Sequence, residues 1–136
     1  MIEIYIDGSS KGNPGPGGAG IVMRDASTQK ILGTLGIPLG YVTNNQAEFL
    51  ALKHALLELQ RRGLSEHLNK ILTDSQLVVG RARANLELVM EIRDLIKEFP
   101  QLTFAYVRGH NGNQGNELAD SLAQDAAESQ KGTKRQ

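Results

Sequence analysis

Three strand-like segments precede the first helical segment of this chain, and strands and helices alternate after it. Apolar and polar side chains alternate over residues 2–6, which predicts a strand that ends at Asp7-Gly8. Residues 21–23 predict a second strand. Residues 31–39 predict a weaker third strand, interrupted by glycine and proline and therefore placed at a sheet edge. Three strands with no helix between them indicate an antiparallel meander.

The first helix has a clear beginning and a clear end in the sequence. Thr43 to Gln46 form a capping box, with Thr43 as the N-cap and the Gln46 side chain reaching back to it. The helix is predicted to run to about Arg62 and to end at Gly63. Its apolar residues cover a wide arc, so we expect it to be well buried.

The second half of the chain alternates between strands and helices, which implies parallel pairing of its strands. The predicted elements are a strand at 71–74, a short helix from Ser75 to near Gly80, a helix at 88–99 closed by Pro100, a strand at 102–107, and a last helix with Asn116 as its N-cap. The expected fold is therefore α/β, with a mixed five-stranded sheet flanked by helices.

A length of 136 residues fits one domain, and the sequence contains no repeat or linker. We expect a domain over residues 1–128 and a flexible basic tail over 129–136. The glycine-rich segments 12–18 and 108–115 are predicted to be irregular.

The composition limits the classes of function. The chain has no cysteine, which excludes disulfides and cysteine metal sites. Its N-terminus lacks the blocks of a signal peptide, so the expected location is the cytoplasm. Lys plus Arg and Asp plus Glu each number 15, giving a net charge of zero. Strong nonspecific binding to nucleic acid is therefore not expected, and such a function would need a local site.

Four carboxylates occupy positions that an α/β fold brings together. Asp7 and Asp74 end predicted strands, and Glu48 and Asp120 lie near the starts of predicted helices. Functional sites of open sheets gather at the carboxyl ends of parallel strands. A cluster of four carboxylates requires protons or cations, and an oxygen-only cluster suits Mg²⁺. Two such ions can support phosphoryl transfer. Any one acidic residue alone is more often solvated surface, so the case depends on shared placement.

The motifs around these carboxylates resemble those of type 1 ribonuclease H. The similarity covers residues 1 to about 128 and keeps the order of five motifs. They are Asp7-Gly8-Ser9 followed by the glycine-rich segment 12–18, Thr43 to Glu48, Thr73 to Gln76, Gly109 to Gly112, and Asn116 with Asp120.

The resemblance implies an endonuclease that hydrolyses the RNA strand of RNA–DNA hybrids and leaves 5′-phosphate and 3′-hydroxyl ends. It implies that Asp7, Glu48, Asp74 and Asp120 bind two Mg²⁺ ions, for which Mn²⁺ can substitute, with Asp7 bridging them. It implies that Glu48 also faces the RNA, and that His110 assists proton movement or product release. The expected active unit is a monomer.

The resemblance also implies a set of substrate contacts. Asn13, Asn44 and Gln76 match positions that contact ribose hydroxyls, a role that suits neutral amides because they both donate and accept hydrogen bonds. Thr43 and Asn45 match positions that hold a DNA-strand phosphate, and a helix start favours an anion. Simple helix capping would also explain Thr43 and Asn44.

Two departures from the family pattern predict weaker hybrid binding. Residues 79–88 contain only Arg81 and Arg83 as basic residues and no aromatic, so the basic protrusion of many bacterial members is missing. Tyr41 stands where an arginine is common. A partner, or the basic residues Lys131, Lys134 and Arg135 of the tail, would have to compensate.

Three other interpretations compete with this one. Residues 15–20 match a dinucleotide-binding glycine pattern, but a strand rather than a helix is expected to follow, so we regard the match as accidental. A non-catalytic hybrid-binding module would be expected to lack one of the four carboxylates. Other nucleases of the wider superfamily share the acidic cluster but lack the Thr-Asn-Asn run at 43–45.

Overall fold

Five strands form one mixed sheet in a computed structural model of the chain, in the order β3-β2-β1-β4-β5. The structure describes residues 1–75, 86–108 and 114–130. Its strands are β1 (Ile2–Ser10), β2 (Gly15–Asp25), β3 (Ile31–Val42), β4 (Asn69–Thr73) and β5 (Leu102–Tyr106), and its helices are α1 (Asn44–Arg61), α3 (Leu86–Ile96) and α4 (Gln114–Glu128).

The strand pairing confirms the predicted combination of a meander and parallel strands. β1 pairs with β2 and β2 with β3 in antiparallel fashion. β1 pairs with β4 and β4 with β5 in parallel fashion. β3 lies at one edge of the sheet, as predicted. β1 therefore joins the two halves, and β4 ends beside Ile6, in the middle of β1.

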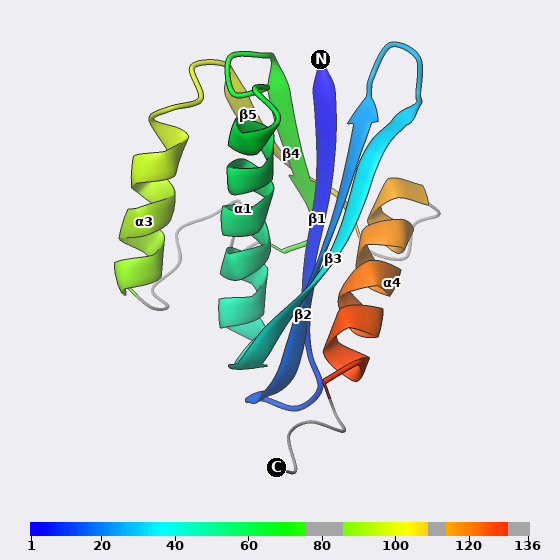
Figure 1. Cartoon of the computed structure of the whole chain (residues 1–136), viewed down its shortest axis with the longest axis vertical. Coiled ribbons are helices and arrows are strands. Elements are labelled where there is room, and N and C mark those ends of the chain that lie inside the picture. The colour runs from blue at the N-terminus through cyan, green and yellow to red at the C-terminus, as the bar shows by residue number, and fades with distance from the viewer. Residues whose placement is uncertain (76–85, 109–113, 131–136) are drawn as a thin grey trace.

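The two faces of the sheet carry separate hydrophobic cores. Figure 1 shows the helices that cover them, with α1 and α3 on one side of the sheet and α4 on the other. Ile2, Ile4 and Ile6 of β1 belong to the core beneath α1 and α3. Tyr5 points to the opposite face, where it packs with Ala119 of α4. This alternation is the period-two pattern of the sequence expressed in space.

The ends of α1 follow the predicted capping chemistry. The Thr43 hydroxyl accepts a hydrogen bond from the Gln46 backbone N–H at 3.1 Å, and the Gln46 side chain accepts one from the Thr43 N–H at 2.9 Å. After the helix, Gly63 has a φ of +72°, a conformation that favours glycine. The helix is well buried along its apolar face, as expected, although Leu57 is 40% exposed.

The prediction that residues 12–18 are irregular is wrong from Gly15 onward, because β2 begins there. Glycine is needed in this strand for close approach rather than for a turn. A Cβ at Gly18 would lie 2.1 Å from the Ala123 carbonyl oxygen, and one at Gly20 would lie 1.8 Å from that of Ala119. The backbone of α4 thus rests directly on β2. A dinucleotide-binding loop would be followed by a helix, but β2 continues past residue 20 to Asp25. The glycine pattern at residues 15–20 is therefore accidental, as expected.

Several other predicted starts and ends need correction. The helix predicted at 88–99 spans Leu86–Ile96, and the strand predicted at 71–74 spans Asn69–Thr73. β1 continues past Asp7-Gly8 to Ser10. Asn116 is not an N-cap, because α4 begins at Gln114 and buries Asn116 to 3% exposure. The short helix predicted from Ser75 to near Gly80 lies, after Ser75, outside the described residues. The same holds for residues 109–113 of the predicted loop before α4.

The predicted tail begins with two residues that the structure places. The Ser129 N–H donates to the Asp125 carbonyl. The Gln130 side chain accepts a hydrogen bond from the Gly40 N–H at 2.7 Å and donates to the Gly17 carbonyl. Residues 131–136 lie outside the described ranges. Among the helices that are described, none has the length and apolarity needed to cross a membrane.

Candidate metal centre and nucleic-acid interface

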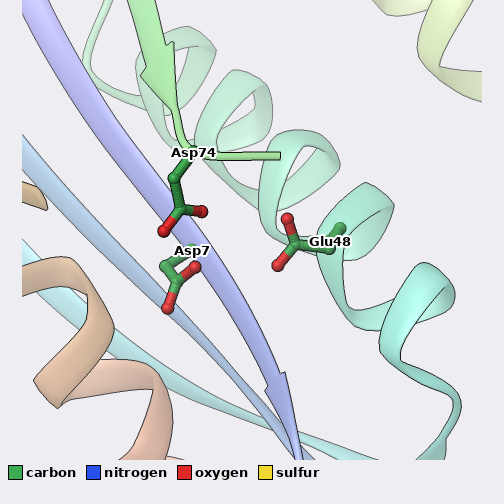
Figure 2. Close-up of side chains that lie close together, drawn as sticks. All are labelled: Asp7, Glu48 and Asp74. Carbon is green, nitrogen blue, oxygen red and sulfur yellow. The ribbon is translucent and has the colours of Figure 1, made fainter. Parts of the chain in front are cut away.

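The register of β1 and β4 brings two of the predicted carboxylates together. Ile6 pairs with Thr73 in the parallel ladder, so Asp7 and Asp74 follow at neighbouring positions. Asp7 is only 6% exposed. Figure 2 shows the two side chains close together where β4 ends against β1.

Glu48 reaches this pair from α1 because the helix backbone packs tightly on β1. A Cβ at Gly8 would lie 2.3 Å from the Ala47 carbonyl carbon, so only glycine allows this approach. The Gly8 N–H donates to Glu48 Oε1 at 3.0 Å, which holds the carboxylate beside Asp7. A hydrogen bond from Ser75 also stabilises the ionised form of Glu48.

Asp7, Glu48 and Asp74 form a compact cluster of oxygen ligands. One carboxylate oxygen from each lies within 4.8 Å of the other two. Figure 2 shows that the three side chains come from three elements and converge. The fourth predicted member, Asp120, is not part of this group of ligand atoms, although its side chain is within hydrogen-bonding reach of Asp7. The Gln124 side chain donates to Asp120 Oδ2 at 3.0 Å.

Burial and mutual repulsion raise the pKa values of two of these groups. The pKa of Asp7 rises to about 10, through burial first, then its hydrogen bond to Asp120 and the charges of Glu48 and Asp74. The pKa of Glu48 rises to about 7, mainly through burial, although the Ser75 and Gly8 hydrogen bonds oppose the rise. Cations would relieve this cost of ionisation, and an all-oxygen donor set suits a hard divalent ion.

The predicted substrate residues that the structure describes lie at the start of α1. The side-chain oxygen of Asn13 accepts a hydrogen bond from the Asn44 N–H at 2.9 Å, which joins the β1–β2 turn to the helix. Asn13, Asn44 and Asn45 are exposed, and Thr43 caps the helix. Their amides are thus available to a ligand.

Some predicted features lie outside the described residues. Gln76 and His110 are among them, as are residues 79–85 of the segment in which the basic protrusion is predicted to be missing. Conversely, Gly8 and Ser75 both support Glu48, and sequence reasoning gave them no separate role. Their only signal was their position next to Asp7 and Asp74.

A family model supplies the deciding comparison, because the model for RNase H matches residues 1–128. The chain belongs to the RNase H family. Its similarity to curated members extends over nearly the whole chain. It is 34% identical over 139 residues to the ribonuclease H of Verminephrobacter eiseniae, covering 90% of this chain and 88% of the relative. It is 38% identical over 146 residues to that of Polynucleobacter asymbioticus, covering 93% and 90%.

Solved structures of RNase H1 share the fold of this RNase H family member. The Halobacterium salinarum protein is 32% identical, with a TM-score of 0.79 over 94% of this chain and 98% of its own. The LC11-RNase H1 structure in complex with an RNA/DNA hybrid is 31% identical, with a TM-score of 0.83 over 95% and 98%. The predicted family and fold class are therefore confirmed.

Proposed function

We propose that this RNase H family member is a metal-dependent endonuclease that hydrolyses the RNA strand of RNA–DNA hybrids. The observation that carries the proposal is the convergence of Asp7, Glu48 and Asp74 from three elements, with carboxylate oxygens within 4.8 Å of one another. The hybrid-bound LC11-RNase H1, which is similar over 95% of this chain, supports the choice of substrate.

The metal ligands in this proposal are Asp7, Glu48, Asp74 and Asp120. Bound divalent ions would activate the attacking water and stabilise charge on the leaving oxygen of the phosphodiester. Asp7 is the central ligand, because it is the most buried of the four and neighbours the other three. The Gly8 N–H donates to Glu48 Oε1 and so keeps this carboxylate oriented toward the site.

The remaining roles follow the family resemblance. Glu48 also faces the RNA near the scissile phosphate. His110 assists proton movement or product release, and cleavage leaves 5′-phosphate and 3′-hydroxyl ends. Asn13, Asn44 and Gln76 contact the 2′-hydroxyls that distinguish RNA from DNA. Thr43 and Asn45 hold a phosphate of the DNA strand at the start of α1, where backbone N–H groups favour an anion.

Further parts of the proposal concern the ions, the assembly and the location. Two Mg²⁺ ions bind each site, and Mn²⁺ can replace them. The active unit is a monomer that works in the cytoplasm. Titration calorimetry would measure the number of ions, sedimentation the mass of the active species, and fractionation of cells the location.

The test is a cleavage assay on hybrid, RNA–RNA and DNA–DNA duplexes of one sequence, each with Mg²⁺, Mn²⁺ or chelator. We expect metal-dependent cuts within the RNA strand of the hybrid, and loss of cleavage in Asp7→Asn and Asp74→Asn. Equal hydrolysis of DNA–DNA would contradict the specificity. Hybrid binding without cleavage in any metal would favour a non-catalytic binding module instead.

A further inference from the structure

Tyr5 lies on β1 two residues before Asp7, on the sheet face that α4 covers. Its side chain is 2% exposed and packs with Val22, Leu72 and Ala119. Neither the motifs nor the proposed chemistry gives this aromatic residue a role. Its place directly before the metal cluster and beneath α4 suggests one.

The Tyr5 ring is held by Arg24 of the neighbouring strand β2, which pairs with Glu3 of β1. Arg24 lies opposite Glu3 in the β1–β2 ladder, and its Nε and Nη2 donate to Glu3 Oε1 at 3.0 and 2.8 Å. Arg24 Nη2 also donates to the Tyr5 hydroxyl at 2.6 Å. The guanidinium carbon lies 5.1 Å from the ring centroid. Arg24, itself held by Glu3, thus restrains the ring, and both charged side chains are partly buried.

The ring also meets the first turn of α4, without any side chain between them. A Cβ at Gly115 would lie 2.4 Å from both Cδ1 and Cε1 of Tyr5. The backbone of α4 at Gly115 is therefore in direct contact with the ring. A bulkier residue at this position would have to push either the ring or the helix away.

One turn further along, the helix makes a second direct backbone contact with the sheet. A Cβ at Gly20 would lie 1.8 Å from the Ala119 carbonyl oxygen. Asp120 follows immediately, and its carboxyl is the hydrogen-bonding neighbour of Asp7. The contacts at Gly115 and Gly20 therefore set the depth at which this part of α4 meets β1 and β2.

We propose that Tyr5 is a positioning residue, whose restrained ring seats the first turn of α4 so that Asp120 reaches the site of Asp7. The inference rests on the proposed function, because it takes Asp120 to be a ligand of the divalent ions. Tyr5 acts through the helix backbone and not on the substrate. The aromatic ring carries the role, and its hydroxyl only helps to hold it in place.

The test measures Mn²⁺ binding by titration calorimetry without nucleic acid, and kcat and KM on a hybrid with Mg²⁺. We expect Gly115→Ala to weaken Mn²⁺ binding and kcat by about tenfold, the loss typical of residues that orient metal ligands, with KM unchanged. Tyr5→Phe keeps the ring and should bind Mn²⁺ as the wild type does. Adding Tyr5→Leu to Gly115→Ala should recover part of the loss, because it makes room for the methyl group.

Ala123→Gly serves as the matched control, since it destabilises the same helix without adding an atom to the interface. It should lower the melting temperature and leave Mn²⁺ affinity unchanged. A folded Gly115→Ala protein with wild-type Mn²⁺ affinity would overturn the inference, even if hybrid cleavage is observed. Losses in the double variant that equal the sum of those in Gly115→Ala and in Tyr5→Leu alone would also overturn it. Weakened Mn²⁺ binding in a chain that cleaves no hybrid would support the inference and defeat the proposed function.

Discussion

Asp7 and Asp74 lie side by side because the residues that precede them, Ile6 and Thr73, are partners in the parallel ladder of β1 and β4. The two carboxylates come from segments far apart in the sequence. Glu48 completes the group from α1 through its hydrogen bond to the Gly8 N–H. Close packing of acidic groups both creates the candidate metal site and destabilises the metal-free fold, and both effects can be measured.

Asp7→Asn should separate the two effects of this cluster. We expect hybrid hydrolysis to fall by about a thousandfold or more, because the central ligand is lost. The same change should raise the free energy of unfolding of the metal-free protein at pH 8 by about 1–3 kcal/mol, since it removes a buried group that resists ionisation. Assays of cleavage and urea unfolding check both. Asp94→Asn, at an exposed position paired with Lys97, should change neither.

The stability of the metal-free protein should fall as the pH rises from about 5 to about 8. Asp7 and Glu48 have raised pKa values, to about 10 and about 7, from ordinary values of 3.8 and 4.5. The folded chain therefore holds protons that the unfolded chain releases, and this contribution to stability is lost between the unfolded and folded pKa values. Urea unfolding in chelator at several pH values measures the slope.

Saturating Mg²⁺ should remove or reverse this slope, because ion binding displaces the same protons. The Asp7→Asn, Glu48→Gln double variant should show a flatter pH profile in chelator than the wild type. If the stability of the metal-free wild type rises with pH over this range, the buried carboxyls do not have the raised pKa values on which the prediction depends.

Gly8→Ala should damage both the fold and the site. The new methyl group would lie 2.3 Å from the Ala47 backbone, so α1 must move away from β1 and carry Glu48 with it. We expect a loss of about 2–4 kcal/mol in unfolding free energy and weaker Mg²⁺ binding. At Gly33 the added methyl would meet only the end of the Arg62 side chain, so Gly33→Ala is the control. Equal effects of the two changes would argue against this account.

Thr43→Ala should reveal whether the N-cap also serves the substrate. Losing the Thr43 hydroxyl, which accepts from the Gln46 N–H, should cost about 1 kcal/mol of stability. If Thr43 also holds a DNA-strand phosphate, KM for the hybrid should rise as well. Thr43→Ser keeps the hydroxyl and should restore both properties. A loss of stability with an unchanged KM would show that Thr43 caps the helix and does not contact the DNA strand.

Truncation after Gln130 should test the basic residues Lys131, Lys134 and Arg135 without disturbing the end of α4. This cut keeps the Gln130 contacts to Gly17 and Gly40. The logarithm of the binding constant for the hybrid falls linearly with the logarithm of the salt concentration. Each lost phosphate contact should reduce the magnitude of this slope by roughly one. Affinity that matches the full chain at low and moderate salt would rule the tail out. Truncation after Ser129 should additionally lower stability, because those two contacts disappear.

Local patterns in the sequence were sufficient for the order of the elements that the structure describes, the capping box at Thr43 and the edge position of β3. Each depends on residues close together in the chain, so it could be predicted without knowing the fold. The glycines at 18 and 20 were misjudged for the same reason. Their role depends on α4, which lies about a hundred residues away in the sequence and packs its backbone onto theirs.

The sequence alone determined the family and the α/β class and led to the prediction of the four acidic residues, because motifs and hydrophobic periodicity depend only on the order of the residues. Only the tertiary structure decided that Asp7, Glu48 and Asp74 share one cluster, and that Tyr5 and Gly8 set the helices against β1. Distances between remote segments arise from strand register and backbone packing, which no single stretch of sequence contains.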